Sequence, residues 1–358
     1  MSRVVLDMAD RRPHWAMPNW VPAELKSALP EGWELVVNAE ETEGTADGAT
    51  RASPAVLTAA RAADAYLGFG IPEELLAAAP GLRWVHSGAA GIGKSLSPTM
   101  LSSPIVFTNS AKVHGPPIAE TVLGMLLFFA RGFDFAVEGQ RSGTWRPDPF
   151  WADGSPIREL AGSTVGLIGF GGIAKEIARR VAGLGAEVVA LKRKEPRPGE
   201  NDLTPVVGSG SLGSRIRLVH GAAGLEHVLA ACDALVVTAP ETAETRGLLG
   251  AAELARLKPG ALVVNVSRGR LVDEEALVRA IAAGRLRGAG LDVFSTEPLP
   301  PESPLWKLSN VLVTPHVSGV TGGFWRRETD LILRNLRRFL EGAPVDEWEN
   351  VVDKRAGY

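Results

Sequence analysis

The stretch Val165-Gly-Leu-Ile-Gly169-Phe-Gly171-Gly-Ile-Ala174 decides the fold of this chain. It matches the pattern G-x-G-x-x-G/A directly after a predicted strand at Thr164–Ile168. Gly169 permits a tight turn, Gly171 lets backbone N–H groups approach a phosphate, and the small Ala174 lets a helix pack closely on the strand. A phosphate would then lie at the N-terminus of that helix, where unpaired N–H groups and the helix dipole favour an anion. The stretch therefore predicts a Rossmann-type dinucleotide-binding domain, although a Gly-rich turn alone can also be merely structural.

Strands and helices alternate on both sides of this turn. After it, the predicted strands are Glu187–Leu191, Arg217–Val219, Leu235–Thr238, Leu262–Val266, Gly288–Val293 and Val311–Thr314, and the predicted helices are Lys175–Gly183, Leu225–Ala231, Ala251–Leu257, Asp273–Ala283 and Phe324–Leu340. Before it, the predicted strands are Val4–Leu6, Leu35–Val37, Ala65–Phe69, Leu82–His86 and Ile105–Thr108, and the predicted helices are Pro22–Leu29, Pro54–Ala63 and Pro72–Ala79. Such alternation predicts α/β architecture, with parallel sheets covered by helices.

An apolar helix and an aromatic arm separate the two alternating regions. Ile118–Arg131 reads as a strongly apolar helix, and the turn-rich segment Gly139–Ser155 contains Trp145, Phe150 and Trp151. Because an exposed apolar surface promotes association, we expect this arm to pack against a partner or a second domain.

Composition excludes several classes of function. The chain has 358 residues, a net charge of −3 at pH 7 and a pI of about 6.1, so no global field draws it to nucleic acid or to an anionic membrane. Its longest apolar run, Val122–Ala130, is shorter than the roughly 20 residues of a membrane span, and Met1–Asp10 does not resemble a signal peptide. Cys232, the single cysteine, cannot form an intrachain disulfide or a Cys-rich zinc site, and we expect it in the core. A soluble cytoplasmic protein of about two domains, without a metal site, is expected.

The strand after the glycine turn ends in Ala190-Leu-Lys192-Arg193-Lys194. At this place, an acid normally holds the ribose hydroxyls of NAD. Lys192 and Arg193 would instead pair with the 2′-phosphate of NADP, so the sequence favours NADP over NAD. The alternative is a solvated basic loop without a ligand.

Three side chains at later strand ends suit the reduction of a 2-oxoacid. Arg268 can hold a carboxylate through paired hydrogen bonds, and His316 can protonate a carbonyl oxygen near neutral pH. Glu297 can orient that imidazole and favour its protonated form. Each alone has an ordinary structural explanation as a surface ion pair, a turn or a capped loop. Their joint presence behind a dinucleotide turn favours catalysis, because ligands of open α/β sheets bind outside the carboxyl ends of the strands.

With these residues the sequence resembles the D-isomer-specific 2-hydroxyacid dehydrogenases over nearly its whole length. The spacing of Arg268, Glu297 and His316 agrees with that family. The other matching motifs are Gly169–Ala174, Pro240-Glu-Thr-Ala-Glu-Thr245-Arg-Gly247-Leu, Lys258-Pro-Gly-Ala-Leu-Val-Val-Asn-Val-Ser-Arg268-Gly, Ala289-Gly-Leu-Asp292-Val-Phe, Glu297-Pro-Leu-Pro and Pro315-His316.

The resemblance implies a role for each matching position. Arg268 would bind the substrate, His316 would be the acid/base and Glu297 would support it. The implied cofactor contacts, beyond Lys192 and Arg193, are Gly169, Gly171, Gly172, Ile173, Pro240, Thr245, Val266, Ser267 and Asp292, the last at the nicotinamide carboxamide. Ala90 and Gly91 would lie in a substrate loop whose backbone N–H groups hold the carboxylate; a plain tight turn is the alternative there.

The resemblance also implies a Rossmann domain, residues 115–315, inserted in a flavodoxin-like substrate domain, residues 1–114 plus 316–358. It implies a homodimer paired through the Rossmann domain and the aromatic arm. The loop 196–213 is longer than is usual in the family, and no regulatory domain is expected after Tyr358.

The leading hypothesis is an NADPH-dependent reductase of small 2-oxoacids such as glyoxylate or hydroxypyruvate. The alternatives are an NAD-dependent phosphoglycerate-type dehydrogenase and a non-enzymatic dinucleotide-sensing scaffold.

Overall fold

The computed structural model describes residues 2–40, 44–45, 48–49 and 51–357. The chain divides into two compact units, Met1–His114 with Val320–Tyr358, and Gly115–Gly319. The sequence placed the second boundary before His316, whereas the compact units divide after Gly319. The division lies after Gly319 because hydrogen bonds tie the segment around His316 to the second unit. Of the predicted substrate-domain range, residues 1, 41–43, 46–47, 50 and 358 lie outside the described residues.

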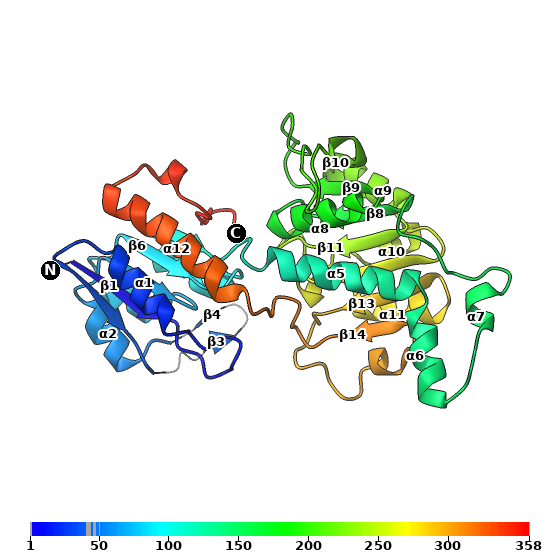
Figure 1. The fold of residues 1–358 in the computed structure, drawn as a ribbon, viewed down its shortest axis with the longest axis horizontal. Coiled ribbons are helices and arrows are strands. Elements are labelled where there is room, and N and C mark those ends of the chain that lie inside the picture. The colour runs from blue at the N-terminus through cyan, green and yellow to red at the C-terminus, as the bar shows by residue number, and fades with distance from the viewer. Residues whose placement is uncertain (1, 41–43, 46–47, 50, 358) are drawn as a thin grey trace. The chain divides into compact units, whose positions relative to one another are not determined.

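The first unit contains a parallel five-stranded sheet (Figure 1). Its strands are β1 (Ser2–Asp7), β2 (Trp33–Val37), β5 (Ala65–Gly68), β6 (Trp84–Ser87) and β7 (Val106–Asn109), in the order β2-β1-β5-β6-β7. This is the flavodoxin-like strand order, in which the first strand of the sheet, β1, lies between the second, β2, and the third, β5. A short antiparallel pair, β3 (Gly44–Thr45) and β4 (Gly48–Ala49), is separate from this sheet.

Helices cover both faces of this sheet. Helices α1 (Trp20–Ala28) and α12 (Phe324–Glu341) pack on one face, and α2 (Pro54–Ala60), α3 (Glu73–Ala78) and α4 (Pro98–Ser102) pack on the other. Alternate strand residues serve the two faces: Val4 and Leu6 contact the first layer, and Val5 contacts the second. The C-terminal helix thus completes the core of a unit built mostly from the first 114 residues.

A buried polar network fixes helix α12 to this sheet. Nε2 of His86 donates to Oε1 of Glu328 at 2.8 Å, and Ser110 Oγ lies 2.7 Å from the other carboxylate oxygen. Thr108 Oγ1 lies 2.9 Å from Nδ1 of the same imidazole, and all four side chains are fully buried. Such a network stabilises a unique arrangement because every buried polar group has a partner.

The second unit contains a parallel seven-stranded sheet. Its strands are β8 (Thr164–Ile168), β9 (Glu187–Lys192), β10 (Ile216–His220), β11 (Ala234–Val237), β12 (Ala261–Asn265), β13 (Leu286–Leu291) and β14 (Val311–Val313), in the order β10-β9-β8-β11-β12-β13-β14. This is the Rossmann order of two mononucleotide-binding halves, extended by a seventh strand. The predicted α/β class is confirmed.

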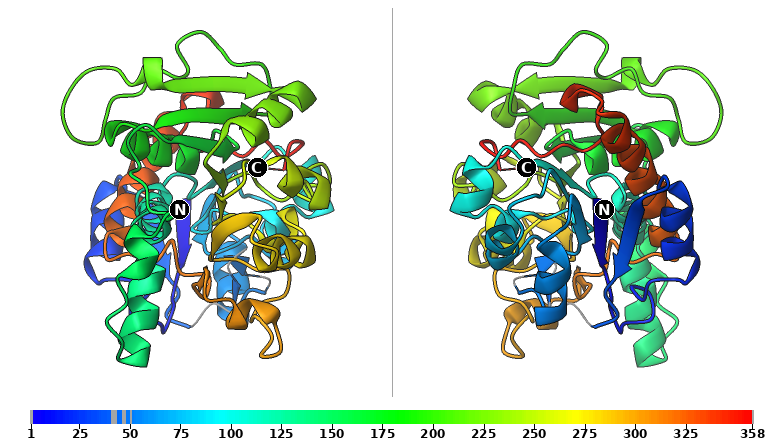
Figure 2. Two further views of the ribbon diagram at one scale, coloured as in Figure 1. Left: turned by 90° about the vertical axis from the view of Figure 1, so that its right-hand side faces the viewer. Right: turned by 90° about the vertical axis from the view of Figure 1, so that its left-hand side faces the viewer.

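Two helical layers enclose the seven-stranded sheet (Figures 1 and 2). Helices α5 (Gly115–Ala130) and α8 (Gly172–Gly183) cover one face, and α9 (Gly221–Ala231), α10 (Ala251–Arg256) and α11 (Glu274–Ala282) cover the other. Val165 and Leu167 of β8 face the first layer, and Ile168 faces the second. Short 3₁₀ helices occur at Gly93–Ser95, Gly213–Arg215, Gly269–Leu271, Pro304–Lys307 and Val345–Glu347.

The sequence did not predict two helices here: α6 (Phe133–Ser142), whose last turn begins the aromatic arm, and α7 (Asp148–Trp151), which lies within it. Arg287 of β13 holds α6 through a buried, bidentate ion pair with Asp134, both contacts being 2.7 Å. The indoles of Trp145 and Trp151 are 94% and 74% exposed within this single chain. Among the described residues, no helix is long and apolar enough to cross a membrane.

Candidate functional site

The glycine turn lies at the point where the strand order of the second unit reverses, between β8 and its neighbour β11. Gly169 has a φ of +103°, and a Cβ there would lie 3.1 Å from the backbone nitrogen of Ala239. Its N–H donates to the carbonyl of Leu191 at 3.0 Å, so the turn is also tied to the end of β9. Only glycine fits both this left-handed conformation and this close approach.

Helix α8 begins immediately after the turn without a side-chain cap. Gly171 is its N-cap residue, and the first intrahelical bond runs from Lys175 N–H to Gly171 C=O at 3.0 Å. The N–H groups of Gly172 and Ile173 lie in the first turn, where a helix has no internal acceptors for them. Ala174 is fully buried against the sheet. A bare helix N-terminus beside a turn that admits no Cβ suits a pyrophosphate, so these residues fit a dinucleotide.

The basic strand end is paired with acids, which the sequence did not predict. Nζ of Lys192 donates to Oε2 of Glu200, and Nε of Arg193 lies 3.5 Å from Oε2 of Glu244. The Lys192 side chain is only 15% exposed, so it is not part of a fully solvated loop. The contact of Lys192 and Arg193 with a 2′-phosphate stays a prediction.

His316 and Glu297 form a hydrogen-bonded pair. Nδ1–H of His316 donates to Oε2 of Glu297 at 2.8 Å, because an ionised carboxylate can only accept. The other oxygen of Glu297 accepts the N–H of Phe294 at 2.9 Å, which fixes the carboxylate at both ends. The imidazole is 29% exposed, and Nε2 is the ring nitrogen left to exchange a proton with a ligand. This is the arrangement that the sequence predicted for an acid/base and its supporting carboxylate.

Asp292 holds the turn that carries His316. Its fully buried carboxylate accepts hydrogen bonds from the Thr314 hydroxyl at 2.6 Å, the Val317 N–H at 2.9 Å and the Ser318 N–H at 3.0 Å. His316 lies inside this span with a φ of +55°, a region that non-glycine residues rarely adopt. The predicted contact of Asp292 with a nicotinamide carboxamide stays a prediction, and its role as a clamp is a further finding.

Arg268 follows the neighbouring strand β12 in a turn that Asn265 organises. The Asn265 side chain donates to the Arg268 carbonyl at 3.0 Å and accepts the Ser267 N–H at 3.1 Å. Arg268 itself donates from Nη1 to the Ser267 carbonyl at 2.7 Å. Val266 and Ser267 are both buried.

Gly269 brings the Arg268 turn against the segment that leads to Glu297. A Cβ at Gly269 would lie 1.9 Å from the carbonyl carbon of Phe294 and 2.3 Å from the nitrogen of Ser295. No side chain can occupy that space, so this glycine is required for the two segments to meet. Asn265 and Gly269 belong to the motif Lys258–Gly269, but the sequence alone indicates no role for either residue, and only the folded contacts reveal one.

The segment after β11 forms a compact turn at Pro240–Thr245. The Thr245 hydroxyl donates to the Pro240 carbonyl at 2.6 Å and accepts the Thr242 N–H at 2.8 Å. The single proton of the Thr245 hydroxyl is therefore donated within the turn. The cofactor contacts proposed for Pro240 and Thr245 stay predictions.

The predicted substrate loop belongs to the first unit. After β6, Ser87 Oγ accepts the N–H of Ala89 at 3.2 Å, and Asn109 Nδ2 donates to the Ala90 carbonyl at 3.0 Å. These bonds hold a tight turn in which Ala90 is exposed and Gly91 half-buried. The structure thus gives the loop a defined local form, and the substrate role of Ala90 and Gly91 stays a prediction.

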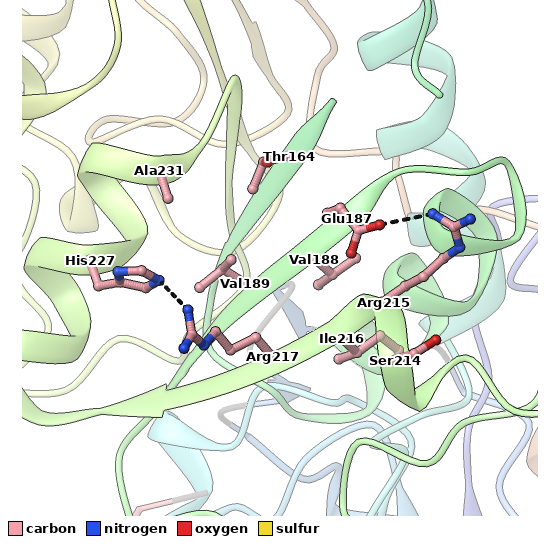
Figure 3. A pocket seen from close by; sticks show the side chains of 10 residues that line it. All are labelled: Thr164, Glu187, Val188, Val189, Ser214, Arg215, Ile216, Arg217, His227 and Ala231. Carbon is pink, nitrogen blue, oxygen red and sulfur yellow. Dashed lines mark hydrogen bonds and ion pairs between the residues drawn. The ribbon is translucent and has the colours of Figure 1, made fainter. Parts of the chain in front are cut away.

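A pocket of about 420 Å³ lies at the opposite edge of the seven-stranded sheet (Figure 3). Thr164, Glu187 and Ile216, which line it, are the first residues of β8, β9 and β10. Arg217 donates to Nε2 of His227 at 3.4 Å across this pocket. None of the predicted site residues lines it, so it is distinct from the candidate site. In the part of the chain that the structure describes, no cluster of His, Cys, Asp and Glu could hold a metal ion.

Comparison with known proteins agrees with this geometry. Residues 123–318 match the family model described as D-isomer specific 2-hydroxyacid dehydrogenase, NAD binding domain. A D-3-phosphoglycerate dehydrogenase of Mycobacterium tuberculosis is 34% identical over 281 residues, which cover 78% of this chain and 49% of that protein. The chain thus spans about half the length of this relative. A glyoxylate reductase of Thermococcus gammatolerans is 33% identical over 277 residues, covering 76% of this chain and 77% of that protein.

Two solved structures resemble the chain over its whole length. A D-isomer specific 2-hydroxyacid dehydrogenase from Xanthobacter autotrophicus, in complex with NADPH and MES, has a TM-score of 0.76 and 29% identity, covering 100% of this chain and 99% of that chain. An NADPH-dependent glyoxylate/hydroxypyruvate reductase from Sinorhizobium meliloti, in complex with NADP and sulfate, has a TM-score of 0.75 and 26% identity, covering 100% of both chains. The family resemblance seen in the sequence is confirmed: the chain belongs to the D-isomer specific 2-hydroxyacid dehydrogenase family.

Proposed function

We propose that this protein is an NAD(P)-dependent oxidoreductase that interconverts a small 2-oxoacid and the corresponding D-2-hydroxyacid. The observation that carries the proposal is the pair of His316 and Glu297 at the same sheet edge as the glycine turn. When bound, the dinucleotide supplies or accepts the hydride. The named activities of the glyoxylate and hydroxypyruvate reductases among the relatives support the same reaction class.

The chain's own residues supply the proton and the positive charge that binds the substrate carboxylate. During reduction, Nε2–H of His316 donates its proton to the oxygen of the substrate carbonyl. Glu297 accepts the Nδ1–H bond and so stabilises the protonated imidazole before transfer and its orientation throughout. Arg268 pairs with the substrate carboxylate through its planar guanidinium, which fixes the carbonyl relative to the acid. Ala90 and Gly91 are proposed to add backbone N–H groups for that carboxylate.

The dinucleotide is proposed to bind along the turn and the strand ends of the second unit. Gly169, Gly171, Gly172 and Ile173 would hold its pyrophosphate. Its nicotinamide would contact Asp292 and the backbone of Val266 and Ser267, and Pro240 and Thr245 would flank it. Lys192 and Arg193 favour NADPH over NADH, because either cation can pair with a 2′-phosphate.

A panel of substrates with both cofactors tests this function. Purified protein is assayed at 340 nm with glyoxylate, hydroxypyruvate and pyruvate against NADPH and NADH, and with D-3-phosphoglycerate against NAD. We expect turnover of a small 2-oxoacid, with a higher kcat/KM for NADPH. Turnover of D-3-phosphoglycerate alone would favour the phosphoglycerate-type alternative, which the similarity to mycobacterial enzymes suggests. Dinucleotide binding without any turnover would favour a non-enzymatic sensor.

We further propose a cytoplasmic homodimer that buries the aromatic arm. Trp145 and Trp151 are largely exposed in the single chain, and water-exposed indoles of this size are typical of interfaces. Light scattering should give twice the chain mass of 37.9 kDa. Trp145→Ser should shift the mass toward that of one chain, and an unchanged dimer in that variant would remove the arm from the interface.

A further inference from the structure

A carboxylate lies at the end of β9, but it belongs to Glu200 in the loop that follows the strand and not to the strand itself. Lys192 donates to Glu200, and the same carboxylate oxygen accepts the N–H of Arg197 at 3.1 Å. The two paired side chains are 15% and 19% exposed, so the pair is largely withdrawn from solvent. The Lys192 hydrogen bond lowers the pKa of the Glu200 carboxyl below its usual range, with a smaller contribution from the charge of Lys175.

The loop between β9 and β10 is anchored, so the position of Glu200 is not incidental. The neighbouring Asn201 donates to the carbonyls of Gly213 and Ile216 at 3.0 and 2.8 Å, which fixes the loop to the start of β10. Leu203 packs against the core on the α5/α8 face of the sheet, and Leu212 is buried in it. Arg179 of α8 donates to the Thr204 carbonyl at 2.9 Å. These contacts bring Glu200 back to the strand that the loop left eight residues earlier.

The Lys192–Glu200 pair lies beside the glycine turn. Ile168 pairs with Leu191 in the sheet, and Gly169 donates to the Leu191 carbonyl at 3.0 Å, so Lys192 adjoins the turn directly. In this fold the end of the second strand faces the adenosine ribose of the bound dinucleotide. NADP and NAD differ there by a dianionic 2′-phosphate in place of a neutral hydroxyl.

We propose that Glu200 limits the preference for NADPH by competing with the 2′-phosphate for Lys192, an inference that rests on the proposed function. A 2′-phosphate must displace the carboxylate from Lys192 before it can pair with that cation. A ribose hydroxyl needs no such displacement and can donate a hydrogen bond to the carboxylate. Glu200 thereby supplies, from the loop, the acid that the strand end lacks.

The test is the isosteric substitution Glu200→Gln, which removes the charge and keeps the shape. Dissociation constants for NADPH and NADH are measured by nucleotide fluorescence, and kcat/KM for both cofactors is measured with the best 2-oxoacid. We expect the ratio of kcat/KM for NADPH to kcat/KM for NADH to rise about tenfold, as for the loss of one competing charged hydrogen bond. The change should appear in the affinity for NADPH, while kcat stays near that of the parent. Glu195→Gln, an exposed carboxylate in the same loop, is the matched control and should leave the ratio unchanged.

A second variant tests the competition itself. In a Lys192→Gln background, Glu200→Gln should change the ratio by less than about threefold, because the contested cation is gone. The inference would be overturned by an unchanged or lower ratio in Glu200→Gln, or by a full tenfold rise without Lys192. If 2-oxoacids are not turned over but both nucleotides bind, the dissociation constants still decide the inference. Binding of neither nucleotide would overturn the proposed function and this inference together.

Discussion

Asp292→Asn tests whether one buried carboxylate positions His316. The carboxylate accepts three hydrogen bonds, from Thr314 and Val317 to one oxygen and from Ser318 to the other. An amide has one oxygen, so its best orientation keeps the first two bonds and turns an NH₂ group toward the Ser318 N–H. Leaving a buried N–H unsatisfied costs about 1–3 kcal/mol, and the two kept bonds lose their charged acceptor. We therefore expect the free energy of unfolding to fall by about 2–4 kcal/mol.

The same substitution should lower kcat, because His316 lies within the clamped turn. A displacement of a catalytic group by about 1 Å can cost about 10²-fold, so a loss of about ten- to a hundredfold is expected. Urea denaturation followed by tryptophan fluorescence measures the stability, and initial rates at saturating 2-oxoacid measure kcat. Asp273→Asn is the matched control. That carboxylate caps helix α11 through one bond to Ala276 N–H, and Asn caps a helix about as well as Asp. An Asp292→Asn protein with parental stability and parental kcat would refute the clamp.

Three further outcomes follow from individual contacts. Glu297→Gln should lower kcat by about tenfold or more, measured from initial rates, because the neutral amide stabilises protonated His316 less; a kcat equal to the parent's would exclude the supporting role. Burial raises the pKa of Cys232 to about 12, so about 10⁻⁴ of the thiol is ionised at pH 8. A disulfide reagent at that pH should label the thiol only after denaturation, and rapid labelling of the folded protein would contradict its buried position. Glu328→Ala should lower the free energy of unfolding by about 3–5 kcal/mol in urea, because buried His86 loses its acceptor; a loss below about 1 kcal/mol would show that the network contributes little.

Periodicity and turn chemistry predicted most of the fold. The strand at Thr164–Ile168 has the predicted bounds, because its apolar residues continue up to Gly169, where a positive φ turns the chain sharply. The helix after it begins at Gly172, three residues before the predicted start, because the glycine turn itself provides the first helical residues. Helix α6 was missed because a long-range contact, the buried pair of Asp134 and Arg287, stabilises it rather than its local sequence pattern.

The candidate site was predictable as far as spacing and strand ends allow. The bond between His316 and Glu297 agrees with the roles inferred from their residue types and positions. The clamp by Asp292 and the pair of Lys192 with Glu200 could not be predicted, because each joins segments whose approach depends on the folded backbone. For the same reason, the compact units divide after Gly319, a few residues beyond the predicted boundary.

The proposed function requires His316 to donate a proton to the substrate in an NAD(P)-dependent reduction of a 2-oxoacid. The most direct measurement compares kcat for that reduction in the parent and in His316→Ala, with the NADPH dissociation constant measured on both proteins. We expect kcat to fall by about 10²–10⁴ while the dissociation constant stays within about twofold. A kcat close to that of the parent, with the same cofactor affinity, would contradict it.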